Sequence, residues 1–160
     1  MVIFSCKKQE ESPRKVFLLD TNWKFINTAI ENGEGISINT NKWETVEVPH
    51  DWAISGEFDE QNDSQMVQVI EDGEEKPMLR TGRTGGLPHV GVGWYRKNLE
   101  INPADKGKRI SIEFDGAMSN SKVYVNGKFV GKWPYGYASF GFDITEFINF
   151  NGEENVLAVR

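Results

Sequence analysis

Two residues that could exchange protons in acid–base catalysis stand side by side, His50 and Asp51. They follow Pro49, which fixes a turn, and an aspartate in a turn accepts hydrogen bonds from nearby backbone N–H groups. Acidic residues also gather within 57–63 and 71–75, where carboxylates could hold calcium. Neither stretch has the alternating aspartate order of a known calcium loop. We therefore interpret these features as a turn and a solvated surface, and we expect no metal and no cofactor.

The longest stretch without an apolar pattern is residues 53–93, which is polar, acidic in patches and rich in glycine towards its end. A connection of this length inside a compact domain is usually functional or disordered. Because it offers few apolar contacts, we expect it to open locally at little cost. The alternative interpretation is a surface loop that only other domains would order.

The segments on either side of residues 53–93, which must position that stretch, have the pattern of β-strands. Residues 110–115 alternate apolar with polar side chains, the period of a half-buried strand. Asn126 and Gly127 form the dipeptide typical of a type I′ turn, so residues 122–125 and 128–130 are predicted to pair as a hairpin. We expect these three strands to be neighbours in one sheet.

Further strands are predicted at 16–19, 23–25, 45–48, 94–101, 140–145 and 155–160, with one helical turn at 145–148. About eight or nine strands and little helix favour an all-β fold, a jelly-roll or galactose-binding-like β-sandwich. The last run is apolar, and no sequence follows to cover it. We therefore expect a sandwich truncated at this edge, where exposed strands would let molecules self-associate.

Composition limits the function. With 160 residues, of which 38% are hydrophobic, the chain can bury one core, and we expect one domain over 16–160. A net charge of −6 argues against a nucleic-acid partner, which requires clustered lysine and arginine. The single cysteine excludes an internal disulfide framework.

The first fifteen residues have the character of a leader or tether. Cys6 follows the small residue Ser5, as a lipid-accepting cysteine does in bacterial lipoproteins, and residues 7–14 form a polar spacer. Only residues 1–4 precede Ser5, whereas a secretory signal needs roughly 7–15 apolar residues. Either Cys6 is a lipid attachment site on a periplasmic or cell-surface protein, or it is an incidental thiol in a disordered end.

Five motifs follow one another in the order seen in glycoside hydrolase family 2. They are Val-Pro-His-Asp-Trp at 48–52, Gly-Val-Gly-Trp-Tyr-Arg-Lys at 91–97, Phe-Asp-Gly at 114–116, Val-Tyr-Val-Asn-Gly at 123–127 and Phe-Asp-Ile-Thr at 142–145. Each motif is weak alone, but the five in order are specific. The chain thus resembles the N-terminal sugar-binding sandwich domain of the family's β-galactosidases over residues 16–160. The glycine-rich loop at 81–88 resembles their secreted bacterial branch.

The resemblance implies an accessory role in an exo-acting β-galactosidase. Retaining glycosidases need two carboxyl groups about 5 Å apart, and the family carries both on a catalytic barrel that is absent from this sequence. We therefore expect no catalytic residue here, and a galactoside and the barrel as partners. The long segment of such enzymes reaches over the barrel to the sugar. The expected substrate contacts in it are Asn62, Arg80, Arg83 and His89.

Aromatic residues offer a second kind of sugar contact. The five tryptophans are predicted to be core, since each buries a large apolar area; they are Trp23, Trp43, Trp52, Trp94 and Trp133. Tyr135 and Tyr137, in a loop, are better candidates for stacking on a sugar ring. Two other functions stay open: a free-standing carbohydrate-binding module, which would bind sugar alone, and a protein-interaction sandwich, which would need a partner chain.

Overall fold

The computed structural model describes residues 14–55, 58–59, 61–62, 64–82 and 91–160. Cys6, Arg83 and His89, which the sequence singled out, lie outside these residues. The described part contains ten strands, two 3-10 turns and no α-helix, which confirms the predicted all-β class. It holds no helix long and apolar enough to span a membrane.

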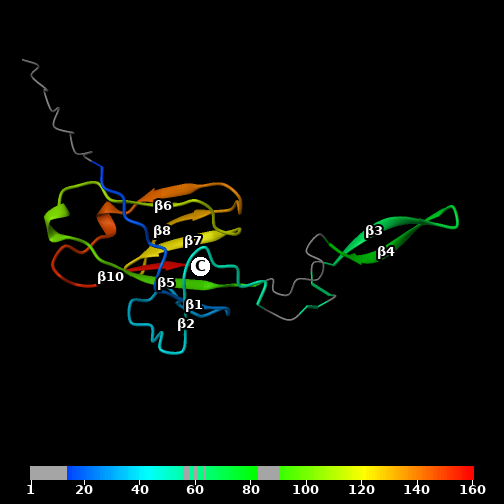
Figure 1. Ribbon diagram of the computed structural model, residues 1–160, viewed down its shortest axis with the longest axis horizontal. Helices are drawn as coiled ribbons and strands as arrows, with labels where there is room; N and C mark the ends of the chain where they lie inside the picture. The colour runs from blue at the N-terminus through cyan, green and yellow to red at the C-terminus, as the bar shows by residue number, and fades with distance from the viewer. Residues whose placement is uncertain (1–13, 56–57, 60, 63, 83–90) are drawn as a thin grey trace, which may run out of the picture.

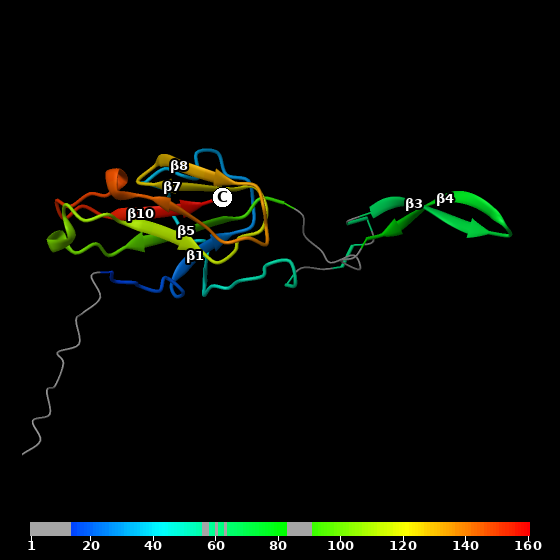
Figure 2. The same cartoon turned by 90° about the horizontal axis from the view of Figure 1, so that it is seen from above.

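Six strands form one antiparallel sheet in the order β2–β1–β5–β10–β7–β8. Their bounds are β1 (Trp23–Ile26), β2 (Glu44–Val46), β5 (Trp94–Leu99), β7 (Ser121–Val125), β8 (Lys128–Trp133) and β10 (Asn155–Val159). A second sheet pairs β6 (Ser111–Phe114) with β9 (Phe140–Asp143) and lies over the first (Figure 1). Figure 2 shows the strands of the large sheet after a turn of 90°. The main apolar core, with Val123 and Leu157 fully buried, fills the space between the two sheets.

The C-terminal strand is central, and the predicted exposed edge is wrong. β10 pairs with β5 on one side and β7 on the other, and all five of its residues are buried. Leu157 and Val159 point into the main core, while Ala158 packs on the opposite face. An uninterrupted apolar run is the pattern of a strand covered on both faces. Self-association through this strand is therefore excluded by its two neighbours.

The block at 109–133 divides between the two sheets, so the prediction of three neighbouring strands is wrong. β6 pairs with β9, whereas β7 and β8 belong to the large sheet. The hairpin itself is confirmed: Asn126 and Gly127 both have positive φ, 52° and 76°. On β8, Gly131 has no side chain where a Cβ would overlap the ring of Phe142. Glycine therefore lets the two layers approach at this point.

The predicted strand at 16–19 does not form. Val16, Phe17 and Leu18 are exposed, and only Leu19 packs against the core. Leu19 instead offers its carbonyl to the indole N–H of Trp23. A short apolar run predicts burial but not a pairing partner, and here no neighbouring strand supplies one among the described residues.

The outer face of the large sheet is covered by the loop at 27–43. Arg96 lies on this face, 5% exposed, and its two guanidinium nitrogens donate to the carbonyls of Gly33 and Ile36 at 2.9 and 3.3 Å. Burial lowers the pKa of this guanidinium. Beside it, Trp43 and Trp94 pack on Ala158 in a second apolar cluster. Arg96 therefore holds the loop at 27–43 against the sheet, and residues of this loop form the second apolar cluster with Trp94 and Ala158.

The long polar segment is a hairpin rather than an irregular loop. Strands β3 (Ser64–Glu71) and β4 (Glu74–Thr81) pair along their full lengths around a turn at Asp72-Gly73, both with positive φ. Figures 1 and 2 show this hairpin standing apart from the sandwich in both views. Eight strands thus make the sandwich and two form a separate arm.

Candidate functional site

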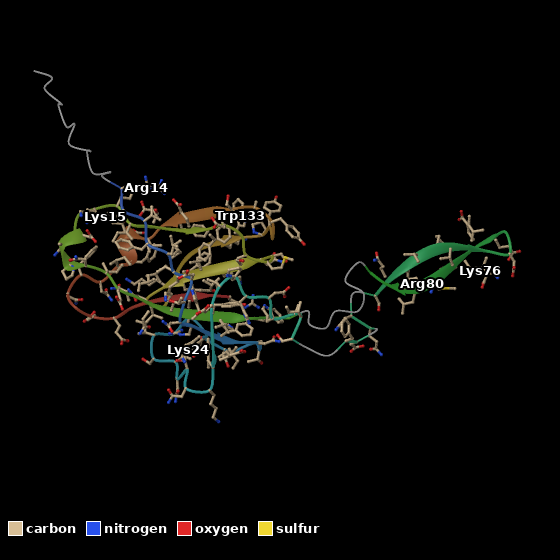
Figure 3. All side chains as sticks on the ribbon, in the orientation of Figure 1. Arg14, Lys15, Lys24, Lys76, Arg80 and Trp133 are labelled. Atoms are coloured by element: carbon tan, nitrogen blue, oxygen red, sulfur yellow. The ribbon has the colours of Figure 1, made fainter. Side chains whose placement is uncertain are left out.

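Two of the four predicted sugar-contacting residues lie at the same end of the arm. Arg80 is on β4, directly opposite Gln65 on β3, near the end of the hairpin remote from the turn. It is exposed, and Figure 3 shows it on the hairpin, with Lys76 nearer the tip. Lys76 pairs with Glu71 at 3.5 Å, whereas no carboxylate of the described chain pairs with Arg80. The Arg80 side chain is exposed, so it presents guanidinium N–H donors at the surface of the arm.

Asn62 lies just before β3, at the same end of the hairpin as Arg80, in a segment that forms two consecutive turns. Its backbone N–H donates to the carbonyl of Asp59 at 3.0 Å, and the Asp59 carboxylate accepts from the N–H of Gln61 at 2.8 Å. The hydroxyl of Ser64 then donates to the carbonyl of Gln61 at 3.0 Å. These bonds fix the backbone around Asn62, which is half-buried. Arg83 and His89, the other two predictions, lie outside the described residues.

The pair His50 and Asp51 is not arranged for acid–base chemistry. The Nδ1 atom of His50 lies 2.9 Å from the Tyr95 hydroxyl, and its ring packs edge-on against Phe25. Asp51 accepts a hydrogen bond from the N–H of Ala53 at 3.0 Å, as the turn interpretation predicted. Burial, and next the charge of Asp51, raises the pKa of the Tyr95 hydroxyl far above its usual value. The Tyr95 hydroxyl therefore stays protonated, and its contact with Nδ1 holds the His50 ring against the core.

A buried amide network, which no motif in the sequence indicates, joins the β7–β8 turn to residues 147–149 and to the start of β10. Asn126 donates to the carbonyl of Phe147 and to the amide oxygen of Asn155, both at 2.8 Å, and accepts from the N–H of Val156. Asn155 in turn bonds both the N–H and the carbonyl of Asn149. The Val-Asn-Gly motif predicted the turn, but no spacing indicates which groups its side chain would meet.

The aromatic residues divide as predicted between core and surface. Trp23, Trp43 and Trp94 are buried, and Trp52 and Trp133 are half-buried. Tyr135 and Tyr137 are 64% and 92% exposed, in the loop that joins β8 to β9. The ring of Tyr135 meets Trp133 edge-on at 5.7 Å, and Trp133 stacks on Phe140 at 5.5 Å. Ring contacts therefore connect Tyr135 in the loop to Phe140 in the core through Trp133. Stacking of Tyr135 or Tyr137 on a sugar stays a prediction.

An open groove of about 540 Å³ lies where β5 ends, at the opposite end of that strand from the connection to the arm. Its lining includes Leu99, Asn102, Phe150 and Asn155. The amides are already engaged, since Asn102 caps the short turn η1 (Pro103–Asp105) and Asn155 belongs to the buried network. No group of three metal-binding side chains occurs among the residues described. The arm therefore has the more accessible donors.

Comparison with known proteins identifies the family. The model described as "Glycosyl hydrolases family 2, sugar binding domain" matches residues 18–160. A beta-galactosidase of Bacteroides ovatus is 38% identical over 154 residues, covering 93% of this chain and 15% of that protein. A putative beta-glucuronidase of Formosa agariphila is 32% identical over 160 residues, covering 100% of this chain and 14% of that protein.

Solved structures agree in both sequence and architecture. The crystal structure of a beta-glycosidase from Bacteroides vulgatus has a TM-score of 0.71 and 31% identity, covering 88% of this chain and 16% of that chain. The present chain thus spans about one sixth of the length of these relatives. The family match extends from residue 18 through the central β10. The chain belongs to glycoside hydrolase family 2, through that family's sugar-binding domain.

Proposed function

We propose that this chain is the N-terminal accessory domain of an exo-acting β-galactosidase, packing on a catalytic barrel of the same polypeptide. The family match and the 38% identity to a beta-galactosidase support the enzyme class. Because the chain spans about one sixth of its relatives, the catalytic chemistry belongs to the remainder of such a protein. The domain itself supplies binding and orientation.

The observation that carries this proposal is the exposed guanidinium of Arg80 at the base of the projecting hairpin. Arginine presents several N–H donors in a fixed plane, which suits the closely spaced hydroxyls of a pyranose. Asn62, whose backbone is held by the turns before β3, lies at the same end. Donors held in this way orient a sugar before reaction, which lowers the entropy that the catalytic step must lose.

Replacing one cation tests the proposal in the enzyme that carries this domain. Arg80→Ala should lower kcat/KM for a chromogenic β-galactoside by about 10- to 100-fold, the loss expected for one charged hydrogen-bond donor. Lys76→Ala is the matched control, because that cation sits nearer the tip and already pairs with Glu71. Unchanged kcat/KM in Arg80→Ala would reject the substrate contact.

A β-glucuronide is the second candidate substrate. It is favoured by the 32% identity to a putative beta-glucuronidase and by the same guanidinium, since arginine binds a carboxylate with two parallel hydrogen bonds. The two substrates separate under Arg80→Gln, which keeps hydrogen-bond donors but removes the charge. A galactoside-specific enzyme should retain much of its activity, whereas a glucuronide-specific one should lose most of it.

The proposal also includes a lipid anchor at Cys6. Lipid on Cys6 would tether the enzyme to a bacterial membrane surface, and stable attachment takes more than one acyl chain. Mass spectrometry of the native N-terminus in the source cell measures this directly. An N-terminal cysteine carrying acyl chains is the expected result, and an unmodified Met1 would reject the anchor.

A further inference from the structure

Among the described residues no further strand pairs with either edge of the projecting hairpin, and its turn determines which backbone groups face outward. Asp72 and Gly73 have φ of 54° and 81°, the conformation of a type I′ turn. In a two-residue hairpin of this type, the flanking residues Glu71 and Glu74 exchange both of their backbone hydrogen bonds. Hydrogen-bonded and non-hydrogen-bonded pairs then alternate along the antiparallel ladder.

Pro77 distinguishes the two edges. It lies opposite Gln68, three pairs from the turn pair, and therefore occupies a non-hydrogen-bonded position. The backbone nitrogen of such a residue points away from the neighbouring strand, which is why proline is tolerated there. The outer edge of β4 consequently lacks a donor at its centre. On β3, the N–H and carbonyl of Gln68 point outward and are intact, so the hairpin can add a strand more readily through β3.

The side chains of β3 favour a second copy of the same strand. Residues 64–70 carry no charge, although the whole chain has a net charge of −6. The charged residues of the hairpin lie at its tip and on β4: Glu71, Asp72, Glu74, Glu75, Lys76 and Arg80. Met66 and Ile70 are 64% and 77% exposed, on one face. Two such edges can therefore meet without opposing like charges, and both bring apolar side chains.

We propose that two copies of the chain pair antiparallel through β3, about a two-fold axis at Gln68, to form a four-stranded sheet. Outward-facing residues must meet one another to exchange hydrogen bonds, which limits the register to even shifts. Centring on Gln68 sets Met66 opposite Ile70 of the second copy, and sets Glu71 opposite the uncharged Gln65. The adjacent allowed register sets Met66 opposite an amide. The chosen pairing is isologous, as two-fold symmetry requires.

Pairing through β3 would also stabilise the arm. A two-stranded hairpin is only marginally stable in water, whereas three or more strands with an apolar face can be stable. The contact is a strand addition through backbone hydrogen bonds. It goes beyond the proposed function, because it involves the β3 edge and requires neither sugar nor barrel. Its test is therefore made in the absence of substrate.

Sedimentation equilibrium of the 160-residue chain, over a wide concentration range, tests the proposal. The chain should show a reversible monomer–dimer equilibrium. Gln68→Pro removes the central outward donor of β3 at the position where the opposite strand already tolerates a proline, and should raise the dimer Kd at least about tenfold. The control Gln68→Thr keeps the N–H and should dimerise like the parent chain. A monomer at every concentration, or a Gln68→Pro dimer of unchanged Kd, would overturn the proposal.

A second pair of variants tests the register. Met66→Lys and Ile70→Glu are both at exposed positions, so neither should disturb the folded monomer. Each should weaken the dimer alone, because it sets a charge opposite an apolar residue. The double variant brings the introduced lysine opposite the introduced glutamate twice across the axis, and should dimerise better than either single variant. A double variant weaker than both singles would overturn the β3–β3 pairing.

Discussion

Two hairpins of this chain have nearly the same turn but opposite surroundings. Asn126-Gly127 has φ of 52° and 76°, and Asp72-Gly73 has 54° and 81°. The first turn joins β7 and β8, where Val123 and Val125 are fully buried, and the second joins two strands with exposed apolar residues. The turn dipeptide therefore determines that a hairpin forms, and the flanking strands determine whether it is built into the core.

The two hairpins also differ in how their turns are held. The Asn126 side chain makes three hydrogen bonds to residues 21 to 30 positions later in the sequence, whereas the arm depends on its own ladder and the exposed Lys76–Glu71 pair. Exposed ion pairs contribute little to stability. We infer that the sandwich is a rigid scaffold and that the arm opens at a much lower free energy.

The largest expected effect is in the shared core. Leu157→Ala removes a fully buried side chain from β10 and should lower the free energy of unfolding by about 2–5 kcal/mol. The matched change on the arm, Leu79→Ala, removes the same atoms from a side chain that is 60% exposed and should cost much less. Urea denaturation measures both. Equal losses in the two variants would contradict the division into scaffold and arm.

Changing the first residue of each turn to glycine compares the turns while keeping positive φ accessible. Asn126→Gly abolishes the buried amide network and should lower the free energy of unfolding by about 1–3 kcal/mol, since Asn155 and the Val156 N–H lose partners. Asp72→Gly should change it by less than about 0.5 kcal/mol. Thermal unfolding of both variants checks this. A loss in Asp72→Gly as large as in Asn126→Gly would show that the side-chain network is unimportant.

The half-buried Tyr95 gives the scaffold a pH dependence. Its pKa is raised by burial, so the folded state resists losing this proton, whereas the unfolded chain loses it at about pH 10. Stability from the protonated hydroxyl is therefore complete below that pH and declines as the pH rises above it. Tyr95→Phe should flatten this alkaline decline, and the exposed Tyr137→Phe should not. If the free energy of unfolding of Tyr95→Phe still declined with pH as in the parent chain, Tyr95 would not be the source of this pH dependence.

The sequence predicted the sandwich well where a pattern reports burial directly. Alternation identified β6, and Asn126-Gly127 identified the turn after β7. Pairing partners were harder, because an alternating strand such as β6 is compatible with either sheet. The apolar run of β10 is compatible with burial on both faces, but its position at the end of the chain favoured an exposed edge, which the pairing with β5 and β7 shows to be wrong.

The polar composition of residues 53–93 predicts a loop, although the segment also contains the local signals of a hairpin. Val67, Val69 and Ile70 followed by Asp72-Gly73 are a strand and a hairpin turn, yet acidic neighbours obscured them. The donor chemistry of Arg80 is visible in the sequence, but its place opposite Gln65 at the start of β3, close to Asn62, follows from the register that the turn sets. Arg96 was missed, since its role depends on a loop sixty residues earlier.

Native-state hydrogen exchange, at concentrations where the chain is monomeric, tests the division into scaffold and arm most directly. Amides of β7 and β10 should exchange only through global unfolding, at the free energy measured by denaturant. Amides of β3 and β4 should exchange many times faster, through local opening that leaves the sandwich folded. Equal protection of both hairpins would contradict this account, because the arm would then be part of the same cooperative unit.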